Sequence, residues 1–257
     1  MSGLQLSLAQ GTLAAFLMAT ARTAGFVLTA PPFNTRSVPS RIRAIVALAL
    51  AIPLTVWMRP TAPSLTSIDL VLQGVLQIVV GAAFGFVVLL AVSTLQVIGD
   101  FIDVIGGFSM TMALDPLQLV QSSVMGRLHQ LIAVTLLFAA DGHLMIIQGF
   151  ARGMQVMPLP VLDPAQLAKT VSEGFVTMFA AAFQVALPVI VVMIVADISL
   201  GLLTRVAPAL NAFALSFPLK LVLSLLLISL IVRQLPDVLA TQVTDAVEAI
   251  LHLAGAG

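Results

Sequence analysis

Residues 70–99 read LVLQGVLQIVVGAAFGFVVLLAVSTLQVIG and contain no charged side chain. A helix needs about 20 apolar residues to cross the hydrocarbon core of a bilayer. This run is longer than one crossing requires, so we expect a helix that tilts, kinks or protrudes. In the whole 257-residue chain, hydrophobic residues make up 60% and charged residues only 9%, whereas a soluble domain carries roughly 25% charge. The sequence therefore predicts an all-α integral membrane protein.

Five further apolar runs approach or exceed the length of a membrane span. They are Leu4–Ala30, Ala44–Met58, Leu128–Ala140 (which could continue through Leu144–Phe150), Phe175–Ala196 and Phe213–Val232. A cleaved signal begins with a basic region, but the first basic residue is Arg22, so we interpret the first run as a retained helix. Pro188 cannot donate to a helix ladder and predicts a kink. We expect about six hydrophobic helices.

These runs divide a single membrane domain, residues 1–257, into four parts. Hydrophobic helices occupy 1–98 and 128–235, a loop region occupies 99–127, and a tail occupies 236–257. Prolines and charges between Arg152 and Glu173 predict an exposed connection. In the tail, apolar residues at helical spacing predict an amphipathic helix that lies on a surface or a partner. They are Leu239, Val243, Ala246, Val247 and Ile250.

The composition also excludes several classes of function. Eleven basic and eleven acidic residues give a net charge of zero, so nothing indicates a nucleic-acid-binding surface. Zero cysteines exclude disulfides and thiolate metal sites. No pair of histidines has the i, i+4 spacing of a helical zinc site, and the chain lacks a Walker loop, a dinucleotide fingerprint and a Ser-His-Asp arrangement. We predict a protein that is not an enzyme and has no cofactor and no metal.

The loop at 31–43 indicates an orientation in the membrane. It holds three arginines and no acid. Cytoplasmic loops carry an excess of basic residues, so this loop is predicted to face the cytoplasm and the N-terminus the opposite side. Elsewhere, the small-residue spacings Gly81…Gly85 and Gly149…Gly153 allow close helix packing.

Charged residues at membrane depth are expensive and are functional candidates. Asp100 and Asp103 lie three residues apart, on one helix face. One interpretation is a proton relay that also uses Asp141 and His143. The other is that the third helix emerges into a polar zone, where both acids are solvated or paired with Arg127. The first would make the chain a proton-coupled transporter of ions or small molecules.

An apolar loop follows the two acids. Non-helical backbone at membrane depth is tolerated only where it is buried in protein or lines a cavity, and methionine makes a deformable apolar lining. From the residues alone, a pore constriction and a plain buried helix connection are equally consistent with this pattern. We call residues 106–116 the plug segment; it consists of Gly106, Gly107, Phe108, Ser109, Met110, Thr111, Met112, Ala113, Leu114, Asp115 and Pro116.

Four motifs in order resemble one known family. They are Arg22…Pro31-Pro32-Phe33…Pro39…Arg41-Ile42-Arg43, Gly99-Asp100…Gly106-Gly107-Phe108…Asp115-Pro116, Asp141-Gly142-His143, and Arg205-Val206-Ala207-Pro208-Ala209-Leu210-Asn211-Ala212-Phe213…Phe217-Pro218-Leu219-Lys220. Together they resemble the FliR/SctT family of type III secretion export-gate proteins over nearly the whole chain. Two positions depart from the family: Asp100 stands where glutamate is expected, and Ala209 where glutamine is usual.

The resemblance implies a partner set and a mechanism. Members join FliP-like and FliQ-like subunits in a helical spiral around a pore, with FlhB-like and FlhA-like proteins associated, in the bacterial inner membrane at the flagellar basal body. Unfolded flagellar substrates pass through that pore. The apolar runs would then be helical hairpins packed on partners, partly lifted from the lipid, and the plug segment, extended to about Gln121, would close the pore.

The resemblance also implies that residues outside the plug segment serve folding and assembly. They are Arg22, Pro32, Pro39, Arg41, Arg43, Asp100, Asp141, His143, Arg205, Pro208, Asn211, Pro218 and Lys220. Three hypotheses follow: an export-gate subunit, a proton-coupled transporter, and a purely structural assembly protein whose residues between Phe108 and Pro116 face no pore.

Overall fold

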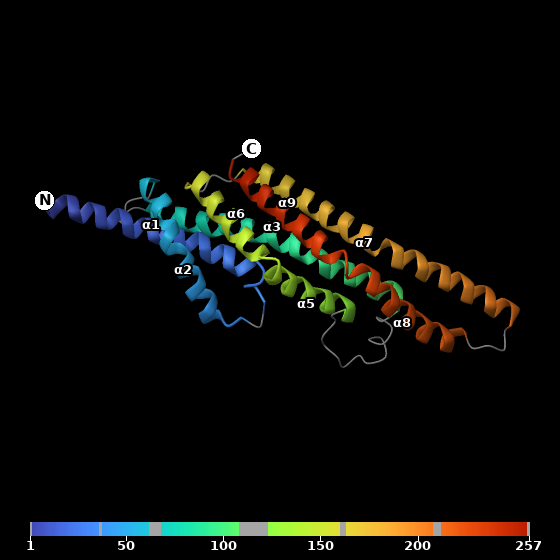
Figure 1. Ribbon diagram of the computed structural model, residues 1–257. Coiled ribbons are helices and arrows are strands. Elements are labelled where there is room, and N and C mark those ends of the chain that lie inside the picture. Colours follow the sequence, from blue (N-terminus) through green and yellow to red (C-terminus); the bar gives the residue numbers. More distant parts are fainter. Residues whose placement is uncertain are drawn as a thin grey trace. The chain divides into compact units, whose positions relative to one another are not determined.

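A computed structural model describes residues 2–35, 38–61, 68–107, 123–159, 163–207 and 212–255. Within these ranges every regular element is a helix, as the composition predicts (Figure 1). The helices are α1 (Ser2–Thr29), α2 (Ser40–Met58), the short 3-10 helix η1 (Arg59–Thr61), α3 (Ile68–Gly106), α5 (Val124–Ala139), α6 (Gly142–Val156), α7 (Pro164–Val206), α8 (Ala212–Ile231) and α9 (Leu235–Leu253).

The apolar runs become helices, and two of these are longer than predicted. Four helices are long and apolar enough to cross a membrane, or up to six if the broken pairs α5 with α6 and α8 with α9 each form one span. This agrees with about six hydrophobic helices in an all-α membrane protein. With 39 and 43 residues, α3 and α7 are about 58 and 64 Å long. Each is roughly twice as long as the 30 Å hydrocarbon core is thick.

Two regions differ from the sequence prediction. Most polar residues of the predicted exposed connection from Arg152 to Glu173 are exposed, but the stretch is largely helical: its first residues end α6, residues 164–173 belong to α7, and Met157 between them is buried. The polar residues there occupy exposed helix faces. Helix α7 continues through Pro188, and the kink at this residue stays a prediction. The region 99–127 begins inside α3 and ends inside α5.

The chain forms two compact units, and α3, α7 and α9 contribute to both. The first contains Met1–Ala91, Asp141–Phe175 and Val243–Gly257. In it, Phe150 of α6 stacks on Phe26 of α1 at 4.2 Å and meets the edge of Phe84 of α3 at 6.4 Å. Burying these rings together contributes both apolar area and favourable ring geometry.

Glycines set the helix spacing in the first unit. A Cβ atom on Gly81 of α3 would overlap the carbonyl oxygen of Arg22 in α1, and one on Gly25 would overlap the carbonyl oxygen of Ile78. On α6, a Cβ on Gly149 would come within 2.8 Å of Val247, a residue of α9. Both predicted small-residue motifs therefore form close helix contacts. Part of the amphipathic tail therefore lies against α6 of the same chain.

The second unit contains Val92–Ala140 and Val176–Gln242. Phe101 of α3 packs edge-on against Phe179 and Phe183 of α7, with ring centroids 6.5 and 5.9 Å apart. The Thr94 hydroxyl donates to the Gln242 side-chain oxygen at 3.1 Å, which ties α3 to the start of α9. This unit holds both helix ends that border residues 108–122.

Candidate functional site

The end of α3 and the beginning of α5 flank residues 108–122, which include most of the plug segment. Of that segment, the structure describes Gly106 and Gly107; residues 108–116 lie outside the described residues. Gly107 has a φ of 78°, a left-handed conformation that glycine adopts without steric cost. Helix α3 therefore ends at the glycine pair that the sequence marks as the start of the plug segment.

Asp103 holds the first turn of α5. It is 3% exposed, and its carboxylate accepts from the Met125 backbone amide at 3.4 Å. The Ser123 side chain caps the same turn by accepting from the Gly126 amide at 2.8 Å. A helix begins with unpaired amides and a partial positive charge, which a carboxylate stabilises. The buried acid thus has a structural partner from another helix, α5.

Asp100 and His129 lie beside this cap. A Cβ on Gly126 would overlap a carboxylate oxygen of Asp100, so the half-buried acid packs against the glycine. His129 is fully buried, and its Nδ1 lies 2.9 Å from the Met125 carbonyl oxygen. Both acids therefore face α5, as their spacing predicts. The predicted pairing with Arg127 is wrong: that side chain is exposed and forms no ion pair among the described residues.

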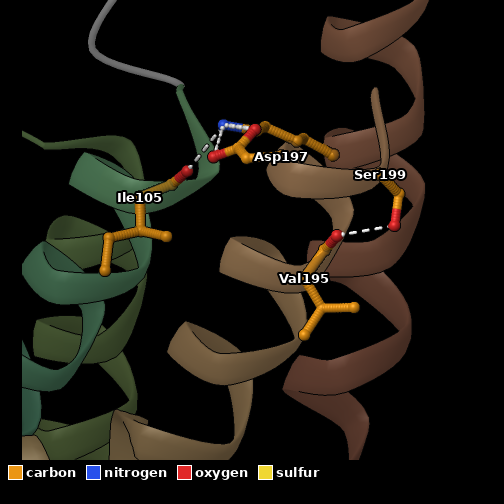
Figure 2. Close-up of polar contacts among 5 residues, drawn as sticks. Ile105, Val195, Asp197 and Ser199 are labelled. Carbon is orange, nitrogen blue, oxygen red and sulfur yellow. Dashed lines mark hydrogen bonds and ion pairs between the residues drawn. The ribbon is translucent and has the colours of Figure 1, made fainter. Parts of the chain in front are cut away.

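Lys220 of α8 forms the other anchor at the end of α3. Its ammonium group lies 2.7 and 2.9 Å from the two carboxylate oxygens of Asp197 in α7, and donates to the Ile105 carbonyl at 3.3 Å. Figure 2 shows the Asp197 carboxylate and the Ile105 carbonyl directed at the same nitrogen. The last carbonyls of a helix lack intrahelical partners and attract cations, so this contact closes α3 immediately before Gly106.

Arg22 makes a separate polar anchor in the first unit. It is fully buried, and its guanidinium donates to the Gln77 side-chain oxygen and to the carbonyl of Met157, with a longer contact of 3.4 Å to the Pro158 carbonyl. Gln77 also donates to Pro158 at 3.1 Å. No carboxylate lies within ion-pair distance in the part of the chain that the structure describes. The carbonyl oxygens of Met157 and Pro158, just past α6, carry the partial negative charge that stabilises the Arg22 guanidinium.

Asp141 and His143 have different surroundings from the other two residues of the predicted relay. Asp141 is exposed and adopts a left-handed φ of 55° between α5 and α6, a conformation that aspartate and asparagine tolerate better than most residues. Its structural role is to end one helix and begin the next. His143 is half-buried in the first turn of α6. These two residues belong to the first unit, and Asp100 and Asp103 to the second.

Some of the remaining predicted assembly residues lie at or near helix ends. Pro39 precedes α2, Arg43 donates to the Thr35 carbonyl at 2.8 Å, and Arg205 lies in the last turn of α7, where a cation opposes the helix dipole. Pro32 is half-buried, Arg41 is exposed, and Pro218 lies inside α8. Pro208 and Asn211 fall outside the described residues.

Three functional contacts were missed from sequence. Gln77 is one of three glutamines, with Gln73 and Gln96, in the charge-free run 70–99, and nothing in the sequence singled it out as the one with a buried partner. Asp197 directly follows the apolar run Phe175–Ala196 and was not among the predicted residues. The Thr94–Gln242 pair joins residues far apart in sequence, and no spacing rule reveals it. Within the described ranges, no group of three or more His, Cys, Asp or Glu residues could hold a metal ion.

These features define an α-helical membrane protein in which several buried polar residues, among them Arg22, Gln77 and Asp103, bind residues outside their own helix. The family described as bacterial export proteins, family 1, matches residues 13–246, and the chain belongs to this family. It is 28% identical to the flagellar biosynthetic protein FliR of Bacillus subtilis (strain 168), with 83% of this chain and 84% of the relative covered. It is 29% identical to FliR of Escherichia coli (strain K12), covering 81% and 80%. A third relative, the surface presentation of antigens protein SpaR of Shigella flexneri, is 26% identical over 59% of each chain.

Because Asp103 caps α5, two substitutions at this position can distinguish a structural role from a proton-carrying role. Asp103→Asn keeps an oxygen that accepts from the Met125 amide, so we expect export to fall less than about threefold. Asp103→Leu leaves that amide unpaired and should reduce assembled protein, by roughly 1–3 kcal/mol of stability. Both variants are tested by measuring flagellar export in motile cells and the level of assembled protein. Loss of export in a fully assembled Asp103→Asn protein would favour the transporter hypothesis.

Proposed function

We propose that this chain is a gate subunit of a flagellar type III export apparatus in the bacterial inner membrane. Family membership supports an export role, and the relatives named FliR match over a larger share of the chain than SpaR does. The subunit would act without catalysis, together with FliP-like and FliQ-like membrane subunits and FlhB-like and FlhA-like export proteins. Its substrates would be unfolded flagellar proteins.

The plug segment is the proposed seal of the pore. The observation that carries this proposal is the pair of anchors at its borders: Lys220 with Asp197 closes α3 just before Gly106, and Asp103 with Ser123 fixes the start of α5. A seal needs fixed ends and an apolar middle, because an apolar constriction blocks ions by excluding a continuous water column. Met110, Met112 and Leu114 would provide that apolar middle.

The proposed seal predicts ion leakage when its middle is removed. Deleting Met110–Leu114, or replacing Met110, Met112 and Leu114 with serine, should let ions through the assembled gate at rest, because a polar lining stays wet. The matched control replaces both methionines with leucine, which keeps apolar volume and should stay tight. Membrane potential in cells, and conductance of the reconstituted complex in planar bilayers, measure leakage.

The Lys220 anchor allows a graded test of the same idea. Lys220→Met removes the contact between α8 and the end of α3, so the seal should leak, but less than after the deletion, whereas Lys220→Arg keeps a cation there and should leak least. A gate that assembles normally and stays as tight after the deletion as before it would contradict the proposed seal.

A further inference from the structure

One face of α2 is apolar and uncovered. Ile45, Ile52 and Val56 are 60, 65 and 70% exposed, whereas Ala51 and Met58 on the opposite face are at most 1% exposed and pack inside the first unit. On an α-helix, residues recurring every three or four positions share a face. The exposed residues therefore form a continuous stripe, which we call the α2 stripe; it consists of Ile45, Leu48, Ile52 and Val56.

Arginines stand at both ends of this stripe. Arg41 and Arg59 are exposed and pair with no acid among the described residues. They are 18 positions apart, which is about five helical turns, so they point in the same direction as the stripe and lie about 27 Å apart along the axis. That separation matches a hydrocarbon core of about 30 Å.

The only tryptophan of the chain lies at the same end as Arg59. Trp57 is half-buried in the last turn of α2. Tryptophan is enriched where the hydrocarbon meets the headgroups, because its ring is apolar and its N–H is polar. Helix α2 therefore has an apolar middle of bilayer length, a cation at each end and an interfacial aromatic residue. The longer α3 and α7 cannot match the bilayer over their whole length.

We propose that the α2 stripe is a lipid-facing surface of this chain, with acyl chains along Ile45–Val56 and the phosphates of anionic phospholipids bound to Arg41 and Arg59. Arginine reaches phosphate by extending its side chain toward the headgroup layer while its methylenes stay on apolar surface, and its planar donors match phosphate oxygens. A partner helix would cover the stripe equally well by hydrophobicity alone. It would leave the two arginines without the acceptors that a bilayer provides at this spacing. The proposal does not depend on the export function.

Trp57 provides the first test. The chain has one tryptophan and no tyrosine, so in the full chain, reconstituted with subunits whose tryptophans are replaced by phenylalanine, emission reports on Trp57. Phospholipids brominated near the carbonyl end of the acyl chain should quench this emission more than phospholipids brominated near the terminal methyl. Equal quenching at both depths, or no quenching by either, would overturn the proposed placement.

Spin labels on the stripe provide the second test. The chain contains no cysteine, so Ile52→Cys carries a single nitroxide, and Glu248→Cys, on the exposed polar face of α9, is the matched water-facing control. Molecular oxygen concentrates in bilayers, so it should increase the spin relaxation rate of the label at position 52 more than a water-soluble nickel chelate does. At position 248 the nickel chelate should have the larger effect. A label at 52 shielded from both reagents would identify a protein partner as the occupant and overturn the lipid assignment.

The amount of lipid that co-purifies with the protein tests whether the two arginines bind headgroups. In Arg41→Gln/Arg59→Gln, the amount of phosphatidylglycerol that co-purifies per chain should fall at least about twofold, because two phosphate-binding cations are lost. Lys169→Gln is the control, since Lys169 is 73% exposed and pairs with Glu173. Equal retention of lipid by the double variant and the control would contradict the headgroup contact.

Discussion

Gly81→Ala is expected to destabilise the first unit strongly, although it adds a single methyl group. The new Cβ would overlap the Arg22 carbonyl oxygen and come within 3.0 Å of the Phe26 amide nitrogen. Both are backbone atoms of α1, so no side chain can rotate away, and α1 must move off α3. Overpacking in a core costs about 1–3 kcal/mol, and we expect the upper end or beyond because backbone must shift. The amount of folded chain in membranes and the melting temperature of the purified protein measure the loss.

Gly201→Ala is the matched control for this substitution. Gly201 lies within α7, and a Cβ placed there meets nothing within 4 Å. Alanine is about 1 kcal/mol more favourable than glycine inside a helix, so this variant should be at least as stable as the parent. If the two variants melt at the same temperature, the close packing of α1 on α3 does not determine the stability of the unit.

Hydrophobic runs predicted where helices lie better than where they end. The run 70–99 marked the centre of α3, but the helix continues to Gly106 and takes Asp100 and Asp103 with it. A prediction from hydropathy ends a span at the first charged residue. The helix itself ends where its backbone hydrogen bonding stops, for example at a glycine. For the same reason α7 exceeds the run 175–196 at both ends.

The candidate site was predicted as residues but not as contacts. The three-residue spacing of Asp100 and Asp103 placed them on one face, and the family resemblance marked Lys220 as an assembly residue. The sequence could not show that Asp103 binds the amides of α5 or that Lys220 binds Asp197 and the end of α3. Such pairs are set by tertiary packing of helices distant in sequence, and short-range periodicity carries no information about it.

Arg22→Met is expected to be the most damaging substitution of a polar residue in the first unit. It removes three donated contacts and leaves the Gln77 oxygen and the Met157 carbonyl without their donor, whereas the Pro158 carbonyl keeps the bond from Gln77. Each unpaired buried acceptor costs about 1–3 kcal/mol, while removing a buried charge returns part of its desolvation energy. Because two buried acceptors lose their donor at once, we expect the loss to exceed the gain.

Arg22→Lys separates charge from geometry in this anchor. Lysine keeps the positive charge, but its single ammonium group cannot reproduce a planar fork directed at acceptors on two different segments. We expect no rescue, because the charge stays buried while its hydrogen bonds are incomplete. The level of folded protein in membranes distinguishes the outcomes. A lysine variant as stable as the parent would mean that charge alone holds α1 in place.

A double-mutant cycle then measures how strongly Arg22 and Gln77 act together. Gln77 receives a bond from Arg22 and donates to the Pro158 carbonyl that Arg22 also contacts, so the two side chains share a partner. Residues in one hydrogen-bond network couple by about 0.5–3 kcal/mol. We expect Arg22→Met and Gln77→Leu together to cost less than the sum of the single changes, because the second substitution removes a group that the first already left unpaired. Gln242→Leu, which affects the separate bond to Thr94, should add to Arg22→Met without coupling. Additivity in both pairs would show that Arg22 is held by its packing and that its bond to Gln77 contributes nothing measurable.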